Sequence, residues 1–108
     1  MKLSYIASAC GLETVGDFAD IDIKGVTSDS RCVNQGDLFI CINGTVSDGH
    51  KYIPDAAAAG ASAFVICDKE AFYAYRTALP RKAIFLYAPD CRKTLAKVSS
   101  YFYGEPSK

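Results

Sequence analysis

The chain has 108 residues, and its 12 lysines and arginines balance 12 aspartates and glutamates, so the formal net charge is zero. Half of the residues are hydrophobic and 22% are charged, which is typical of one soluble globular domain. The neutral balance gives no general attraction to nucleic acid, and no apolar run approaches the roughly 20 residues of a membrane span. We therefore expect neither nucleic acid nor a membrane as a partner.

The five cysteines argue against a bound metal. No two of them lie closer than nine residues, and the chain has one histidine, His50. Structural zinc sites use closely spaced cysteine and histidine pairs, so we expect no metal in this chain. An odd number of cysteines without such pairs is typical of reduced thiols, and we expect a cytoplasmic location.

Hydrophobic periodicity predicts alternating helices and strands. Residues 3–10 fit a short helix, and residues 21–26 alternate as in a half-buried strand. Further on, continuous apolar runs predict strands at 37–42, 63–67 and 83–87, and helical spacing predicts helices at 52–61, at 69–78 and after a cap at Asp90. For the last helix, the expected inner face is Leu95, Val98, Tyr101 and Phe102. This order predicts a three-layer α/β fold with a mainly parallel sheet flanked by helices, to which 21–26 adds at one side.

The first connection that could bind a ligand is residues 26–31. It carries three hydroxyls, the Asp29 carboxylate and the Arg31 guanidinium directly after a predicted strand. Hydroxyls and backbone amides can bind the edge of a base, and Arg31 can pair with a phosphate or a carboxylate. A polar turn accounts for the same residues if Asp29 bonds its own backbone and Arg31 pairs with a nearby acid. Both interpretations remain open.

The second connection is residues 43–51, between a buried strand and an alanine-rich helix. Its glycines allow close backbone approach, and the helix that follows could receive an anion at its N-terminus, with Lys51 adding positive charge. The alternatives are a turn at Asn43 and Gly44 and a helix cap at Asp48. The Gly-x-x-x-x-Gly-Lys-Ser/Thr spacing of a phosphate-binding loop is absent from the sequence.

Two other sets of residues carry less chemistry. Asp29 and Asp48 could form an acid/base pair, but both lie in turns, where aspartate is common. Four tyrosines could stack on bases, but their helical positions without interleaved basic residues favour packing: Tyr73, Tyr75, Tyr101 and Tyr103.

Together, several motifs resemble the N-terminal domain of the Mur ligases, the ATP-dependent enzymes that build the peptidoglycan stem peptide on a UDP-linked sugar. The motifs occur in the family's order along nearly the whole chain: Gly25 to Arg31, Gly36 to Ile40, Gly44, Asp48 to Ile53, and Ala57 to Ala61. The segment Phe102 to Ser107 is most similar to the tripeptide-forming ligase, which adds meso-diaminopimelate or L-lysine to UDP-N-acetylmuramoyl-L-alanyl-D-glutamate.

The resemblance implies that this domain holds the UDP-N-acetylmuramoyl end of the dipeptide substrate. By position, Ser28 and Ser30 match residues that contact the uridine. A short loop that touches the nucleotide-sugar matches Thr45, Val46 and Ser47. Supporting or phosphate contacts are expected from Asp29, Arg31, Gly44, Asp48, Gly49 and Lys51.

The resemblance also implies that the catalytic residues lie elsewhere in a larger ligase. The family uses ATP, Mg²⁺, a phosphate-binding loop and a carbamylated lysine to activate the D-glutamate carboxylate. We expect residues 1–103 to be the substrate domain and 104–108 to begin a linker to an absent ATP-binding domain. The expected partners of this domain are the missing central and C-terminal domains of the same ligase. On that expectation the chain alone has no catalytic residues and no cofactor. Two alternatives stay open: the same domain of the D-alanyl-D-alanine-adding Mur ligase, and a stand-alone α/β interaction module.

Overall fold

The computed structural model describes residues 2–16, 19–42, 49–75 and 84–103. These residues form a sheet of five strands in the order β1-β5-β4-β3-β2. The strands are β1 (Glu13–Val15), β2 (Gly25–Thr27), β3 (Asp37–Ile40), β4 (Ala63–Ile66) and β5 (Ile84–Tyr87). Strands β2 to β5 pair in parallel, and β1 pairs antiparallel with β5. The predicted mainly parallel sheet is confirmed.

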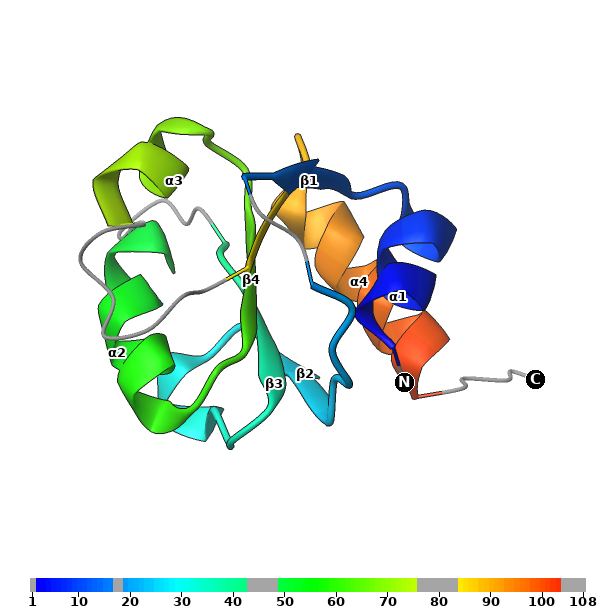
Figure 1. Ribbon diagram of the computed structural model, residues 1–108, viewed down its shortest axis with the longest axis horizontal. Helices are drawn as coiled ribbons and strands as arrows, with labels where there is room; N and C mark the ends of the chain where they lie inside the picture. The colour runs from blue at the N-terminus through cyan, green and yellow to red at the C-terminus, as the bar shows by residue number, and fades with distance from the viewer. Residues whose placement is uncertain (1, 17–18, 43–48, 76–83, 104–108) are drawn as a thin grey trace.

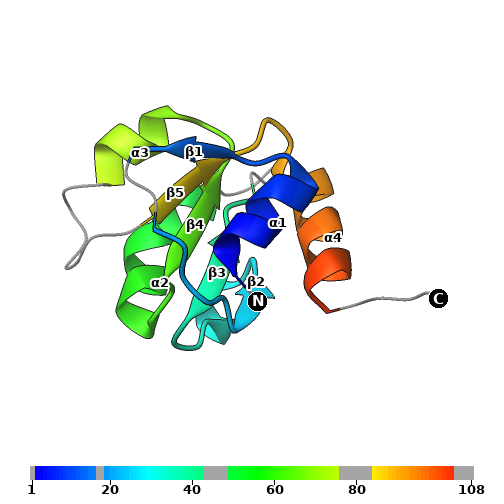
Figure 2. The same ribbon diagram turned by 45° about the vertical axis from the view of Figure 1, so that its right-hand side comes forward.

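Helices cover both faces of the sheet, which gives the three predicted layers (Figures 1 and 2). One face packs against α1 (Leu3–Cys10) and α4 (Cys91–Phe102), and the other packs against α2 (Ile53–Ala59) and α3 (Glu70–Tyr75). Two short 3₁₀ helices, η1 (Ser30–Cys32) and η2 (Gly49–Tyr52), lie in the connections that follow β2 and β3. No helix in the described part of the chain has the length and apolar character needed to cross a bilayer.

The continuous apolar runs form strands because both of their faces are buried. In β3, Leu38 and Ile40 face the α1/α4 side, whereas Phe39 faces the α2/α3 side. On the α2/α3 side, Phe64 stacks on Phe85 at 5.5 Å between ring centroids and meets Phe39 edge-on at 6.2 Å. Alternate residues of a strand point to opposite faces, so each run supplies two cores.

Two predicted elements differ from the structure. The half-buried strand predicted at 21–26 is confirmed only at its end, where Gly25–Thr27 forms β2, while Asp22 makes an isolated bridge to Lys2. The inner face predicted for the last helix is wrong at Tyr101, which is 42% exposed. Its buried residues are Cys91, Thr94 and Val98. The predicted cap is confirmed, because the Lys93 backbone N–H donates to the Asp90 carboxylate at 3.2 Å.

Candidate functional site

The candidate site lies where parallel strands end and their connections begin. Strands β2 and β3 are parallel neighbours, so the segments that follow Thr27 and Ile40 both leave the sheet at the carboxyl ends of these strands. Open α/β sheets bind ligands beyond the carboxyl ends of their strands. The first connection is described in full, and the second is described at residues 41–42 and 49–52.

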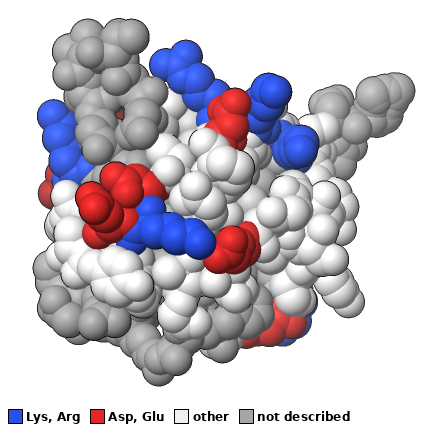
Figure 3. All heavy atoms as spheres, turned by 90° about the horizontal axis from the view of Figure 1, so that it is seen from above, with Lys and Arg blue, Asp and Glu red and all other residues white. Residues whose placement is uncertain are grey.

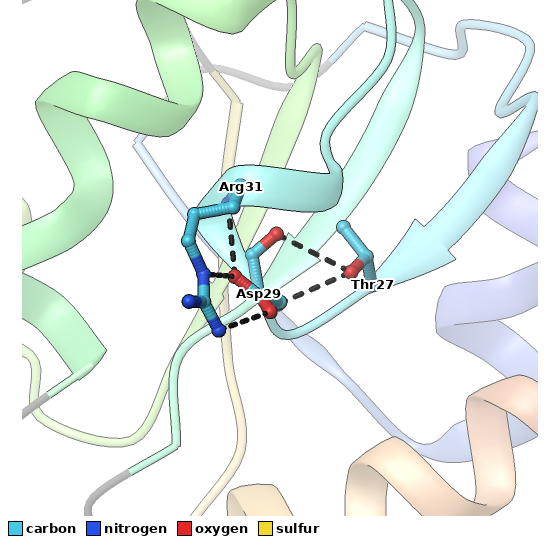
Figure 4. A network of polar contacts seen from close by, with 3 residues as sticks. All are labelled: Thr27, Asp29 and Arg31. Atoms are coloured by element: carbon cyan, nitrogen blue, oxygen red, sulfur yellow. Dashed lines mark hydrogen bonds and ion pairs between the residues drawn. The ribbon is translucent and has the colours of Figure 1, made fainter.

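Asp29 organises the first connection by bonding in both chain directions (Figure 4). Its backbone N–H donates to the Thr27 hydroxyl oxygen at 3.1 Å, and that hydroxyl donates to the Asp29 carbonyl at 3.4 Å. Its carboxylate accepts from the Arg31 backbone N–H at 2.9 Å, from Nε at 3.1 Å and from Nη2 at 3.0 Å. The internal hydrogen bonds and the ion pair expected of a polar turn are therefore present.

This pairing balances the charge of Arg31. The hydrogen bonds from the Arg31 side chain and backbone lower the pKa of Asp29, and the same carboxylate raises the pKa of Arg31. The Arg31 side chain is nevertheless 88% exposed. A guanidinium has five N–H donors, and Asp29 accepts from Nε and from Nη2. Nη1 makes no hydrogen bond to the described residues, so its donors can bind a ligand.

Ser28 and Ser30 lie on either side of Asp29. Ser28 is exposed and Ser30 is half-buried at the start of η1. Within the described ranges, neither hydroxyl makes a hydrogen bond, whereas the side chains of Thr27, Asp29 and Arg31 are all engaged with one another. The turn thus uses alternate residues for its own structure, and one exposed and one half-buried serine alternate with them.

The second connection contributes its last residues to the described site. Gly49 begins η2, and Lys51 is exposed, with its Nζ 5.3 Å from the centroid of the Tyr52 ring. The N-cap of α2 is Tyr52, and the alternative of a helix cap at Asp48 lies outside the described residues. The expected contacts at Gly44, Thr45, Val46, Ser47 and Asp48 lie outside the described residues.

Two contacts bring the described parts of both connections together. Helix η1 packs against α2, and Val33, just after η1, is buried in the same cluster as Ile53. After the larger contribution of Asp29, Cys32 and Tyr52 also raise the pKa of Arg31. The acidic Asp55 lies in the first turn of α2 and reduces the positive field of that helix end.

The resemblance implies ATP and Mg²⁺ for the whole ligase. Among them, no group of three or more His, Cys, Asp or Glu side chains could hold a metal ion. The face of the molecule in Figure 3 carries interspersed basic and acidic side chains rather than a large area of one sign.

Tyr103, at the end of α4, reaches the site from the other end of the chain. Its hydroxyl accepts from the Val26 N–H at 3.2 Å and donates to the Val26 carbonyl at 3.3 Å. The prediction that this tyrosine is a packing residue is wrong, since its side chain is exposed, as are those of Tyr73 and Tyr101. No local pattern signals the contact, because 77 residues separate its partners.

Comparison with known proteins identifies one family. The family described as "Mur ligase family, catalytic domain" matches residues 22–103. The UDP-N-acetylmuramoyl-L-alanyl-D-glutamate–2,6-diaminopimelate ligase of Clostridioides difficile (strain 630) is 44% identical over 108 residues, which are 100% of this chain and 21% of that protein. The ligase of the same name from Chlorobaculum tepidum is 46% identical over 92 residues, or 85% of this chain and 17% of that one.

Solved structures agree on the fold. A crystal structure of MurF from Acinetobacter baumannii superposes with a TM-score of 0.70 at 18% identity, covering 96% of this chain and 21% of that one. At that identity the likeness speaks for the fold alone. This chain spans about a fifth of the length of the relatives that it matches.

Proposed function

Because this chain belongs to the Mur ligase family, we propose that it is the part of a ligase that holds the UDP-N-acetylmuramoyl end of UDP-N-acetylmuramoyl-L-alanyl-D-glutamate. One observation carries the proposal: 44% identity to a ligase named for that substrate extends over the whole chain. The proposed binding site lies beyond the carboxyl ends of β2 and β3, between Asp29 and Tyr52.

The first connection has the chemistry that a uridine diphosphate requires. The hydroxyls of the exposed Ser28 and the half-buried Ser30 can donate to and accept from the edge of the uracil ring. The Nη1 edge of Arg31 can reach a phosphate oxygen while Asp29 holds the other edge in place. Asp29 itself serves as the support of the turn rather than as a phosphate contact, since a carboxylate repels an anion.

The second connection completes the proposed site. Thr45, Val46 and Ser47 are proposed to touch the nucleotide-sugar, and Gly44, Asp48 and Gly49 are proposed to shape their loop. Lys51 is exposed at the described end of this connection and can add positive charge for the diphosphate. These assignments rest on the family motifs, with the contacts of both η1 and η2 with α2 as their structural support.

The whole ligase is proposed to use ATP and Mg²⁺ and to act in the cytoplasm in peptidoglycan synthesis. ATP would supply the phosphoryl group that activates the D-glutamate carboxylate, and other domains of the same protein would bind it. Relatives at 44% and 46% identity are named for 2,6-diaminopimelate, which supports this amino acid over lysine. The similarity to the MurF structure lies at 18% identity and supports the fold alone. It therefore gives no support to the alternative that this chain belongs to the D-alanyl-D-alanine-adding ligase.

The proposal is tested with the whole gene product. Translation beyond Lys108 should encode a Gly-Thr-Asn-Gly-Lys-Thr-like loop within about a dozen codons. The purified full-length protein, given ATP, Mg²⁺ and UDP-N-acetylmuramoyl-L-alanyl-D-glutamate, should ligate diaminopimelate. Ligation of lysine instead would correct the amino acid. Activity only with D-alanyl-D-alanine on the tripeptide substrate, or a stop codon with no ligase activity, would overturn the proposal, the latter in favour of a stand-alone interaction module.

A further inference from the structure

The contact between Tyr103 and Val26 satisfies an otherwise unpaired position at the edge of the sheet. Strand β2 is the last in the strand order, and Val26 is aligned with Leu38 of β3. The N–H and the C=O of a strand residue point to the same side, and those of Val26 point outward to the one Tyr103 hydroxyl. A hydroxyl can accept and donate at once, so this group replaces a neighbouring strand at that residue.

Both ends of this contact are held by other parts of the fold. The Tyr103 backbone N–H bonds the Ser99 carbonyl at the end of α4, and its ring meets the Phe102 ring edge-on at 4.9 Å. Phe102 in turn packs against the core between α1, α4 and the sheet. The hydroxyl is therefore fixed by the helix, although the Tyr103 side chain is exposed.

From Val26 the chain leads within one residue to the candidate site. Thr27 follows Val26, its hydroxyl receives the Asp29 N–H, and the Asp29 carboxylate receives the Arg31 N–H. Both bonds join residues two positions apart, so the turn starts directly from the end of β2, and the position of that end sets where the turn lies. Since β2 has only three residues, one additional anchor on its outer edge is a large fraction of what holds it.

We propose that Tyr103 is a positioning residue that orders the turn of residues 27–31 through its two hydrogen bonds to Val26, and so couples the C-terminal end of α4 to ligand binding. The part of this proposal that concerns the ligand rests on the proposed function. The ordering of the turn does not, because the hydrogen bonds exist in the chain without a ligand.

The test compares Tyr103→Phe with Tyr101→Phe. Both variants keep an aromatic ring on an exposed position of the same helix end, and only the first removes the bonds to Val26. Amide hydrogen exchange and amide chemical shifts are measured by NMR without ligand, together with thermal unfolding to detect a global loss of stability. In Tyr103→Phe, the amides of Val26, Asp29 and Arg31 should exchange about five-fold faster. Tyr101→Phe should leave them unchanged.

The same two variants are then titrated with UDP. Tyr103→Phe should bind UDP about five-fold more weakly than the wild type, and Tyr101→Phe should bind it equally well. If Val26 alone responds, or if both variants behave alike, Tyr103 only seals the strand edge and the proposal is overturned. Undiminished UDP affinity in Tyr103→Phe would overturn the coupling to the ligand. A wild-type chain that binds no UDP at millimolar concentration would overturn the proposed function, and the exchange data would then decide the ordering role by themselves.

Discussion

The carboxylate of Asp29 holds both the backbone and the side chain of Arg31, two residues further along the chain. The pair thereby closes the turn that follows β2 and removes most of the net charge that Arg31 would bring to a ligand. Arg31 is fixed in direction rather than free as a cation. Its remaining donors can select an anion by geometry, which is how a pre-organised guanidinium gains specificity.

The first prediction concerns the titration of Asp29. In Arg31→Met, the pKa of Asp29 should rise toward the ordinary aspartate value, because the hydrogen bonds that lower it are lost. A carboxylate with a lowered pKa contributes stability above its unfolded pKa and loses it as the pH falls through the folded pKa, below about pH 4. NMR titration of the side-chain carboxyl carbons measures the change. Lys51→Met is the control, and an equal shift there would show that the pairing is not the cause.

The second prediction concerns Ser30. Ser30→Ala should weaken UDP binding by about 1 kcal/mol, or roughly five-fold, as expected for the loss of one hydrogen bond. Calorimetry or NMR titration gives the dissociation constants. Ser100→Ala on the exposed side of α4 is the matched control. Normal affinity in Ser30→Ala together with a loss in the control would place the uridine elsewhere.

The third prediction concerns two glycines that end helices. Gly11 and Gly60 both have positive φ angles, of 68° and 117°. A Cβ on Gly11 would meet nothing within 4 Å, whereas on Gly60 it would lie 2.7 Å from the backbone Cα of Gln35. Gly11→Ala should therefore cost about 1 kcal/mol of backbone strain, and Gly60→Ala should cost clearly more. Denaturant unfolding measures both, and equal losses would contradict the close approach seen at Gly60.

The fourth prediction concerns thiol reactivity. Cys32 is exposed in η1, whereas Cys41 and Cys91 are buried, and burial raises the pKa of Cys91. With a small disulfide reagent near pH 8, Cys32 should react first and Cys91 only as fast as the fold opens. Mass spectrometry of the labelled peptides gives the order. Cys32→Ser should remove the fast phase, and an unchanged fast phase in that variant would contradict the described exposure.

The central strands could be predicted from the sequence because burial on both faces leaves a direct trace. The runs at 37–42, 63–67 and 83–87 are apolar at consecutive positions, and each of them contains a strand of the observed sheet. Strand β1 has no such trace. Glu13 and Thr14 are exposed and Val15 is half-buried, and they form a strand only because β5 offers a partner, with Glu13 opposite Tyr87.

The candidate site was predictable in its position and only partly in its internal contacts. Strand order places the connections after β2 and β3 at the same end of the sheet. The polar residues of the first connection form a cluster in the sequence. The Asp29–Arg31 pair is local, so it could be anticipated as one of two interpretations. The bond from Tyr103 to Val26 could not be, because it depends on how α4 packs on the sheet.

The most direct test of the account is an NMR titration of the ¹⁵N-labelled chain with UDP-N-acetylmuramoyl-L-alanyl-D-glutamate. We predict weak binding with chemical-shift changes centred on residues 27–31 and 43–51. Unchanged spectra at millimolar ligand, or changes centred on a distant element such as α3, would contradict the claim that this chain holds the UDP-sugar end of the substrate.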